Sequence, residues 1–162
     1  MVKSRYYQGQ FKKGFTLIEL LVVIAIIGLL ASIILVSLNS ARQKARDTRR
    51  ISDLRQVALG LELYYDNNNN AYPSVTGCTQ ANWQGTMTTA LQGTYMSNVP
   101  LDPLNNATYF YAYSSNGTKY VLKARLENTA NTALNTDVDG DALSCTTANG
   151  ASCNDPAYCI MP

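Results

Sequence analysis

The chain has 162 residues, with 13 basic and 11 acidic side chains, a formal net charge of +2 and no histidine. The missing histidine excludes cysteine–histidine catalysis. The sequence also contains neither a GxSxG nucleophile turn nor a Walker phosphate loop. We therefore predict that the protein is not an enzyme and has no catalytic residues.

A long apolar segment, residues 20–38, lies near the N-terminus. It reads LLVVIAIIGLLASIILVSL, in which Ser32 and Ser37 are the only polar side chains. About 20 such residues, each rising 1.5 Å, span the ~30 Å hydrocarbon core of a bilayer. The alternative is a buried core helix, but this segment is apolar on every face, and the remaining chain is too small and polar to enclose it. The sequence therefore predicts one membrane-spanning helix.

A short motif, KKGFTLIE at residues 12–19, precedes this segment. A Sec signal peptide is cut after its apolar run, whereas here basic residues and a glycine come before it. The pattern resembles the class III leader of type IV pilins and type II secretion pseudopilins. That resemblance implies that a prepilin peptidase removes a leader, residues 1–14, by cutting after Gly14, and methylates the new N-terminus, Phe15.

The same resemblance implies that the carboxylate of Glu19 serves filament assembly. Its partner would be the amino group of Phe15 on a neighbouring subunit, because a carboxylate buried between packed helices needs an opposite charge. The alternative is an acid that the membrane interface tolerates, since the cost of a carboxylate falls toward the end of a membrane helix.

Basic residues lie on both sides of the apolar segment, so the positive-inside rule alone leaves its orientation open. The peptidase of this family works on the cytoplasmic face. The resemblance therefore implies a single-pass protein of the bacterial inner membrane, with a cytoplasmic N-terminus and its C-terminal domain outside. Basic residues 42–55 could contact nucleic acid, but no aromatic residue lies among them. Anionic headgroups or acids on neighbouring subunits are the predicted partners.

Beyond residue 38 the helix is predicted to continue, giving a spine helix over residues 15–65. Apolar residues recur there at steps of three and four, which indicates one buried stripe: Ile51, Leu54, Ala58, Leu61 and Tyr65. The charged residues between them are expected on the solvated side: Arg50, Asp53, Arg55 and Glu62. Four asparagines after Asp66 favour a turn that ends the helix.

Residues 66–162 are predicted to form a small globular α+β domain. Residues 86–96 are expected to form a short helix with Met87, Ala90 and Leu91 inward, and VPLDP at 99–103 a loop. Residues 109–113 and 120–126 are strand-like and are joined through an Asn-Gly turn, which predicts a hairpin. The order of these elements over residues 11–126 resembles the G-type major pseudopilin. It implies the pilin fold, a long N-terminal helix packed on a small antiparallel sheet.

An acidic cluster, Asp137, Asp139 and Asp141, lies in a glycine-containing segment near the C-terminus. Alternate aspartates can supply the oxygen ligands that calcium prefers, although the spacing is not that of an EF-hand. G-type pseudopilins are known as calcium binders near their C-terminus, so the resemblance makes calcium the one candidate cofactor. The alternative is a surface turn without a metal.

Four cysteines, Cys78, Cys145, Cys153 and Cys159, lie in this domain. They favour disulfides in an oxidising compartment, since a zinc site would lack histidine and closely spaced cysteine pairs. Three pairings are open. We expect one local C-terminal bridge and a second bridge from Cys78 to the C-terminal region.

The sequence thus predicts a structural subunit that polymerises through its N-terminal helix. The resemblance implies a homopolymer, the pseudopilus of a type II secretion system, with the prepilin peptidase and an inner-membrane assembly platform as partners. A type IV pilin for adhesion, motility or DNA uptake is one alternative. A single-span membrane-anchored binding protein is another, because an anchor and a fold do not by themselves fix function.

Overall fold

The computed structural model describes residues 14–145 and 152–162 of the chain. The chain divides into two compact units, Met1–Ser40 and Ala41–Pro162. Residues 1–13 of the predicted leader lie outside the described residues.

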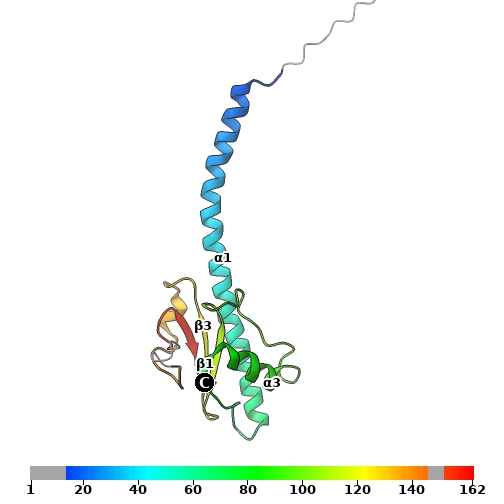
Figure 1. Ribbon diagram of the computed structural model, residues 1–162, viewed down its shortest axis with the longest axis vertical. Helices are drawn as coiled ribbons and strands as arrows, with labels where there is room; N and C mark the ends of the chain where they lie inside the picture. The colour runs from blue at the N-terminus through cyan, green and yellow to red at the C-terminus, as the bar shows by residue number, and fades with distance from the viewer. Residues whose placement is uncertain (1–13, 146–151) are drawn as a thin grey trace, which may run out of the picture. The chain divides into compact units, whose positions relative to one another are not determined.

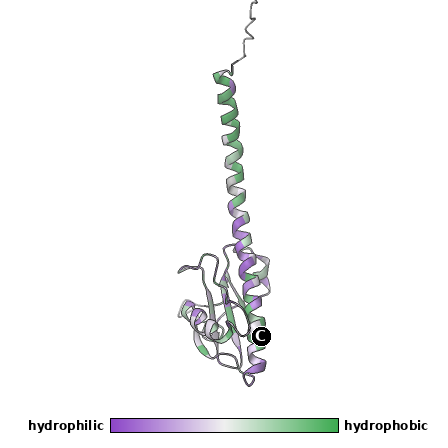
Figure 2. Cartoon of the chain, turned by 90° about the vertical axis from the view of Figure 1, so that its right-hand side faces the viewer, coloured by the Kyte–Doolittle hydropathy of each residue, from purple (hydrophilic) through white to green (hydrophobic). Residues whose placement is uncertain are grey.

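The first helix, α1, extends over Leu17–Asn67 (Figure 1). It begins and ends two residues later than the predicted spine helix, 15–65. Its end follows from the asparagine run, where Asn69 and Asn70 have φ angles of 56° and 57°. This left-handed conformation is one that asparagine adopts more easily than most residues. Hydrophobic residues dominate the N-terminal part of α1, and polar residues become frequent in its C-terminal part (Figure 2).

The apolar stripe on the C-terminal part of α1 packs as predicted. Leu54 and Leu61 are fully buried, and Ile51, Ala58 and Tyr65 are half-buried against the same core. Val57, which was not part of the predicted stripe, is fully buried as well. The expected solvated side was wrong for two charged residues, because the Arg50 side chain is fully buried and Asp53 is 8% exposed.

Four strands form one antiparallel sheet in the order β1-β2-β3-β4. They are β1 Val75–Thr79, β2 Tyr111–Ser115, β3 Tyr120–Arg125 and β4 Ala157–Ile160. The predicted hairpin is confirmed, with β2 beginning two residues later than expected. Its turn is held by the Asn116 side chain, which accepts hydrogen bonds from the backbone N–H groups of Thr118 and Lys119 at 3.0 and 2.9 Å.

The helical segment between β1 and β2 lies earlier in the chain than predicted. It comprises α2 Gln80–Asn82, the π-helix η1 Trp83–Met87 and α3 Thr88–Leu91. Thr79 caps its start by accepting a hydrogen bond from the Asn82 N–H at 3.1 Å. Met87 and Leu91 are buried as expected. Trp83 is also buried and donates from its ring nitrogen to the Pro100 carbonyl at 2.8 Å, which fixes the predicted loop against the helix.

The two faces of the sheet pack against different cores. One face, with Tyr111, Tyr113, Tyr120 and Leu122, packs with the buried residues of α1. The other face, which we call the disulfide face, carries Ala112 and Val121 and packs with all four cysteines. This division follows from the period-2 alternation of side chains along β2 and β3.

The cysteines pair as Cys78–Cys145 and Cys153–Cys159. The second bridge is local, with a sequence separation of 6 residues, and the first spans 67 residues. Both match the expected arrangement of one local C-terminal bridge and one bridge from Cys78. A 3-10 helix, η2 Thr132–Asn135, precedes the segment that contains Asp137 and Asp139.

Candidate functional site

The start of α1 is closed by a reciprocal pair of hydrogen bonds between Thr16 and Glu19. The backbone N–H of Thr16 donates to the Glu19 carboxylate at 2.8 Å, and the Glu19 N–H donates to the Thr16 hydroxyl oxygen at 3.3 Å. The Thr16 hydroxyl also donates to the same carboxylate at 2.7 Å. This is a capping box, in which a T-x-x-E sequence satisfies donors that the first helical turn leaves free. The T-x-x-E pattern is visible in the sequence, but the two hypotheses for Glu19 were filament assembly and a tolerated acid at the membrane interface.

Gly14 and Phe15 precede this cap, in residues that belong to no helix. A Cβ atom built on Gly14 would meet no atom within 4 Å, so the fold does not require glycine there. The Phe15 side chain is 82% exposed. A constraint on these two positions would therefore come from something other than packing within this chain.

The N-terminal part of α1 exposes its large apolar side chains. Leu17, Ile18 and Leu29 are 64–80% exposed, and the most apolar 18-residue window of α1 has a mean hydropathy of 3.1 with none of it buried. By length and composition α1 is the one helix of the described residues that can cross a membrane. An isolated surface of this kind is unfavourable in water, because apolar area exposed there costs roughly 25 cal/mol per Å².

A network of buried ion pairs connects the C-terminal part of α1 to two loops. The Arg50 guanidinium donates to Asp102 at 2.7 Å and to Glu127 at 2.7 Å, and it contacts Asp47 on its own helix at 2.8 Å. Arg46 makes two further hydrogen bonds to Glu127, at 2.7 and 2.6 Å. Hydrogen bonds from Arg46, with those from Arg50, outweigh burial and lower the pKa of Glu127 to about 2.

This network corrects the partners predicted for two of the basic residues in the segment 42–55. Arg46 and Arg50 pair with acids of their own domain rather than with headgroups or another subunit. Asp102 belongs to the loop that the VPLDP motif predicted, so the aspartate of that motif is the counter-ion of a helix residue 52 positions earlier. This pairing could not be predicted from the sequence, because both residues have the pattern of ordinary surface charges.

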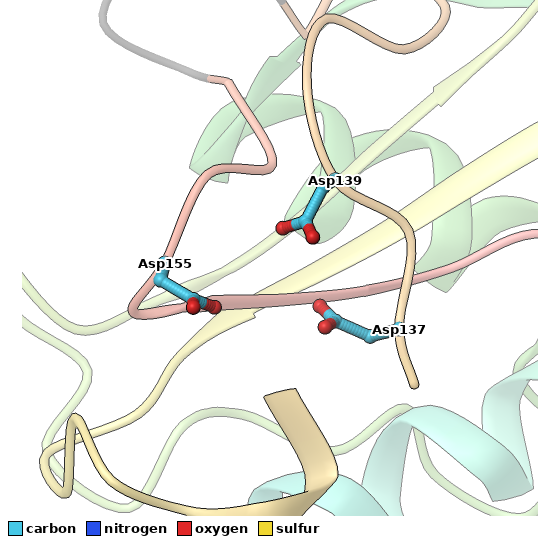
Figure 3. A group of neighbouring side chains, drawn as sticks. All are labelled: Asp137, Asp139 and Asp155. Atoms are coloured by element: carbon cyan, nitrogen blue, oxygen red, sulfur yellow. The ribbon is translucent and has the colours of Figure 1, made fainter. Parts of the chain in front are cut away.

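Three carboxylates converge near the disulfide face: Asp137, Asp139 and Asp155 (Figure 3). One oxygen from each lies within 4.8 Å of the others. This group contains Asp155 and does not contain Asp141, which was expected beside Asp137 and Asp139. Asp155 immediately precedes Pro156 and β4, and it reaches the cluster only because β4 pairs with β3. No local sequence signal could have joined it to Asp137.

The chemistry of this cluster fits a hard cation. One oxygen of Asp137 accepts the backbone N–H of Cys159 at 2.8 Å. The other oxygen, Oδ1, is buried without a hydrogen-bond partner among the described residues. Burial raises the pKa of the Asp137 carboxyl above its ordinary value. A divalent cation would satisfy the buried oxygen and neutralise the repulsion among the carboxylates, and oxygen-only ligands are those that calcium prefers.

Comparisons with known proteins agree with this structure. Residues 10–35 match the family model described as the prokaryotic N-terminal methylation motif. The chain is 32% identical over 124 residues to the type II secretion system core protein G of Pseudomonas aeruginosa, covering 69% of this chain and 80% of that protein. It is 30% identical over 114 residues to the core protein G of Vibrio cholerae, covering 65% of this chain and 73% of that protein.

A relative from another assembly matches a shorter part. The chain is 47% identical over 58 residues to the type IV wide pilus major component of Thermus thermophilus, which covers 36% of this chain and 44% of that protein. No solved structure was found that matches the chain.

A methylation motif at the start of an exposed apolar helix, followed by a small antiparallel sheet, defines a pilin-like protein. Within that class, the similarity across 80% of the Pseudomonas protein shows the family. The chain belongs to the family of type II secretion system core protein G, the G-type pseudopilins.

Proposed function

We propose that this chain is a structural, non-enzymatic subunit of a type II secretion pseudopilus, which polymerises through its N-terminal helix. The observation that carries the proposal is the similarity to a core protein of that system over 80% of its length. The exposed apolar part of α1 supports it, because such a surface needs lipid or neighbouring helices around it.

Processing after Gly14 is part of the same proposal. The capping box begins at Thr16, so removal of residues 1–14 leaves every group of the cap in place, with Phe15 as the new N-terminus. The leader, residues 1–14, is proposed to stay on the cytoplasmic side, with residues 41–162 outside. We assign the leader, the membrane-spanning residues 20–38 within the spine helix, and the globular residues 66–162 as the functional divisions of the chain.

In the filament, the Glu19 carboxylate is proposed to pair with the amino group of Phe15 on a neighbouring subunit. Removal of the leader creates that amino group at the start of α1, in the segment that carries Glu19. Within one chain the carboxylate accepts two hydrogen bonds from Thr16, and a carboxylate has further acceptor sites. The cap and the proposed pair are therefore compatible.

Asp137, Asp139 and Asp155 are proposed to hold calcium. The cation would supply positive charge among three carboxylates that otherwise repel one another. Bound there, it would connect the segment after η2 to the residues that lead into β4.

A type IV pilus subunit is the second candidate, and the match to the Thermus pilus component favours it. That match covers 36% of the chain, whereas the similarity to the Pseudomonas core protein covers 69%. The secretion pseudopilus therefore stays the primary proposal.

The experiment is intact-mass measurement combined with a secretion assay in the source bacterium. The mature chain is expected to lack residues 1–14 and to carry one added methyl group. Deletion of the gene should abolish export of the substrates of the type II system. Gly14→Trp should leave the precursor uncut without disturbing the fold, because nothing lies within 4 Å of a Cβ at this position. A chain cut after residue 40, or export that is normal in the deletion strain, would contradict the proposal.

A further inference from the structure

The disulfide face of the sheet carries two cations on its third strand. On β3, Tyr120, Leu122 and Ala124 belong to the core that contains α1. Because side chains alternate along a strand, Lys123 and Arg125 lie on the opposite face. β3 pairs with β2 on one side and with β4 on the other. These cations therefore lie in the interior of the sheet rather than at its edge.

Both cations line a cavity of about 470 Å³ on this face. The residues that line it also include the apolar Phe110 and Pro156, the polar Asn154 and the acidic Asp155. The volume lies within the range of roughly 300–1,000 Å³ that is usual for small-molecule sites. The cavity is thus apolar on part of its wall and positively charged on another part.

The positive charge of this cavity is incompletely compensated. Among residues 14–145 and 152–162, neither Lys123 nor Arg125 has a carboxylate oxygen within 4.0 Å. Lys123 is half-buried, and burial together with the neighbouring Arg125 guanidinium lowers the pKa of its amine. A charge removed from water without a counter-ion is unfavourable, so a bound anion would relieve this cost.

We propose that this cavity binds a small organic anion, with a carboxylate or phosphate group on Lys123 and Arg125 and an apolar body against Phe110 and Pro156. The forked guanidinium matches the two oxygens of either group, and the ammonium supplies a second charge-assisted hydrogen bond. The apolar wall distinguishes such a ligand from a bare inorganic ion.

The negative charge of Asp155 should affect the affinity of the site for anions, and this effect can be measured. Among the described residues that line the cavity it is the one acid, and its negative charge repels an incoming anion. Removing that charge should therefore tighten anion binding, whereas removing either cation should weaken it. Opposite effects of two neighbouring charges are not expected from a change in overall folding.

The experiment is an NMR titration of the ¹⁵N-labelled full chain in detergent micelles, at constant ionic strength and with a chelator present. The probes are phenyl phosphate and benzoate, with inorganic phosphate and the neutral benzyl alcohol as comparisons. Phenyl phosphate, benzoate or both should shift the amide signals of Phe110, Lys123 and Arg125 saturably. The probe that binds with the higher affinity shows whether the site prefers a phosphate or a carboxylate. Benzyl alcohol should not shift them saturably, and inorganic phosphate should bind more weakly.

Matched variants complete the test. Lys123→Gln and Arg125→Gln should each weaken binding about tenfold, as expected for loss of a hydrogen bond to a charged group. Lys119→Gln, an equal change of charge at an exposed position outside the cavity, should leave the affinity unchanged, and Asp155→Asn should increase it. Arg125 is exposed, so its variant tests the site even where replacement of Lys123 disturbs the fold.

The proposal would be overturned if neither ring-bearing anion gave saturable shifts. It would also be overturned if Lys119→Gln weakened binding as much as Lys123→Gln and Arg125→Gln, because binding would then reflect net charge alone. The chelator keeps this result independent of calcium, and the micelles keep it independent of filament assembly.

Discussion

Glu19 has one observed role and one proposed role, and single substitutions can separate them. It completes the capping box of α1 through its hydrogen bonds with Thr16. In the proposed filament its negative charge also compensates the amino group of Phe15 on a neighbour. A truncation to alanine removes both roles at once, so it cannot tell capping from assembly.

Glu19→Gln and Thr16→Val distinguish the two roles. Glutamine keeps an acceptor for the Thr16 N–H but loses the charge, so filament formation should fail while the full-length or processed chain still inserts in the membrane. Valine removes the hydroxyl cap, which costs about 1 kcal/mol at the helix start, and leaves the charge, so filaments should form. Electron microscopy of cells that overproduce each variant provides the measurement. Filaments of Glu19→Gln as abundant as those of the parent would mean that the charge is not needed.

Arg50 is the central residue of the buried ion network. Its side chain is fully buried, and its partners Asp47 and Asp102 are 0% and 4% exposed. Asp47 also accepts the backbone N–H groups of Glu127 and Asn128, both at 2.9 Å. Arg50 therefore neutralises carboxylates that the rest of the domain uses as backbone acceptors.

Arg50→Ala is expected to destabilise the domain by about 3–5 kcal/mol, because it leaves buried carboxylates without their counter-ion. Arg55→Ala is the matched control, since Arg55 lies on the same helix and is exposed. Denaturant unfolding of the full chain in detergent, followed by tryptophan fluorescence, gives both values, since the one tryptophan, Trp83, lies in the core. Equal effects of the two changes would show that the buried network contributes no more than a surface charge.

At the level of elements, the two disulfides constrain the chain to different extents. Cys78–Cys145 joins β1 to the segment that follows Asp137 and Asp139, across 67 residues. Cys153–Cys159 closes a segment of 6 residues at β4. Each bridge reduces the entropy of the unfolded chain. Both bridges also pack in the core on the disulfide face.

Removal of the long-range bridge should cost more than removal of the local one. The chain-entropy relation gives about 4 kcal/mol for a loop of this length and about 2 kcal/mol for the short loop. The comparison uses the double variants Cys78→Ser with Cys145→Ser, and Cys153→Ser with Cys159→Ser, measured by denaturant unfolding. A larger loss from the local pair would mean that the packing of β4, rather than loop entropy, determines the difference.

On the scale of the whole molecule, the acidic cluster exists only in the folded chain. Asp137 follows η2 and Asp155 precedes β4, and pairing of β4 with β3 brings their carboxylates together. A cation held by this cluster therefore binds the folded state and not the unfolded one. Such binding stabilises the fold by mass action.

Calcium is accordingly expected to raise the Tm of the full chain, and a chelator should reverse the increase. At a calcium concentration 100 times the Kd, the stabilisation is about 2.7 kcal/mol. Asp155→Asn should abolish most of the calcium-dependent increase in Tm, whereas Asp141→Asn should retain it, because Asp141 is not in the cluster. Differential scanning calorimetry with and without calcium measures both. A calcium-dependent increase lost in Asp141→Asn but kept in Asp155→Asn would favour the set of ligands expected from the sequence.

The sequence alone determined the features that depend on neighbouring residues. The motif at residues 12–19, the apolar run that follows, the end of α1 at the asparagine run and the Asn-Gly hairpin each rest on a few adjacent positions. Their physical causes are local: the length and hydropathy of one segment, the conformational preference of asparagine, and the geometry of a tight turn.

The tertiary structure decided what depends on distant partners. Arg50 was predicted to lie on the solvated side of the helix, yet it is buried. Its charge is neutralised there by Asp102 and Glu127, which lie 52 and 77 residues later in the chain. Asp155 joins Asp137 and Asp139 only because β4 pairs with β3, and β1 and β4 are too short and too mixed in composition to be recognised alone. A buried charge is stable only when a partner is present, and the sequence lists residues without showing which of them meet.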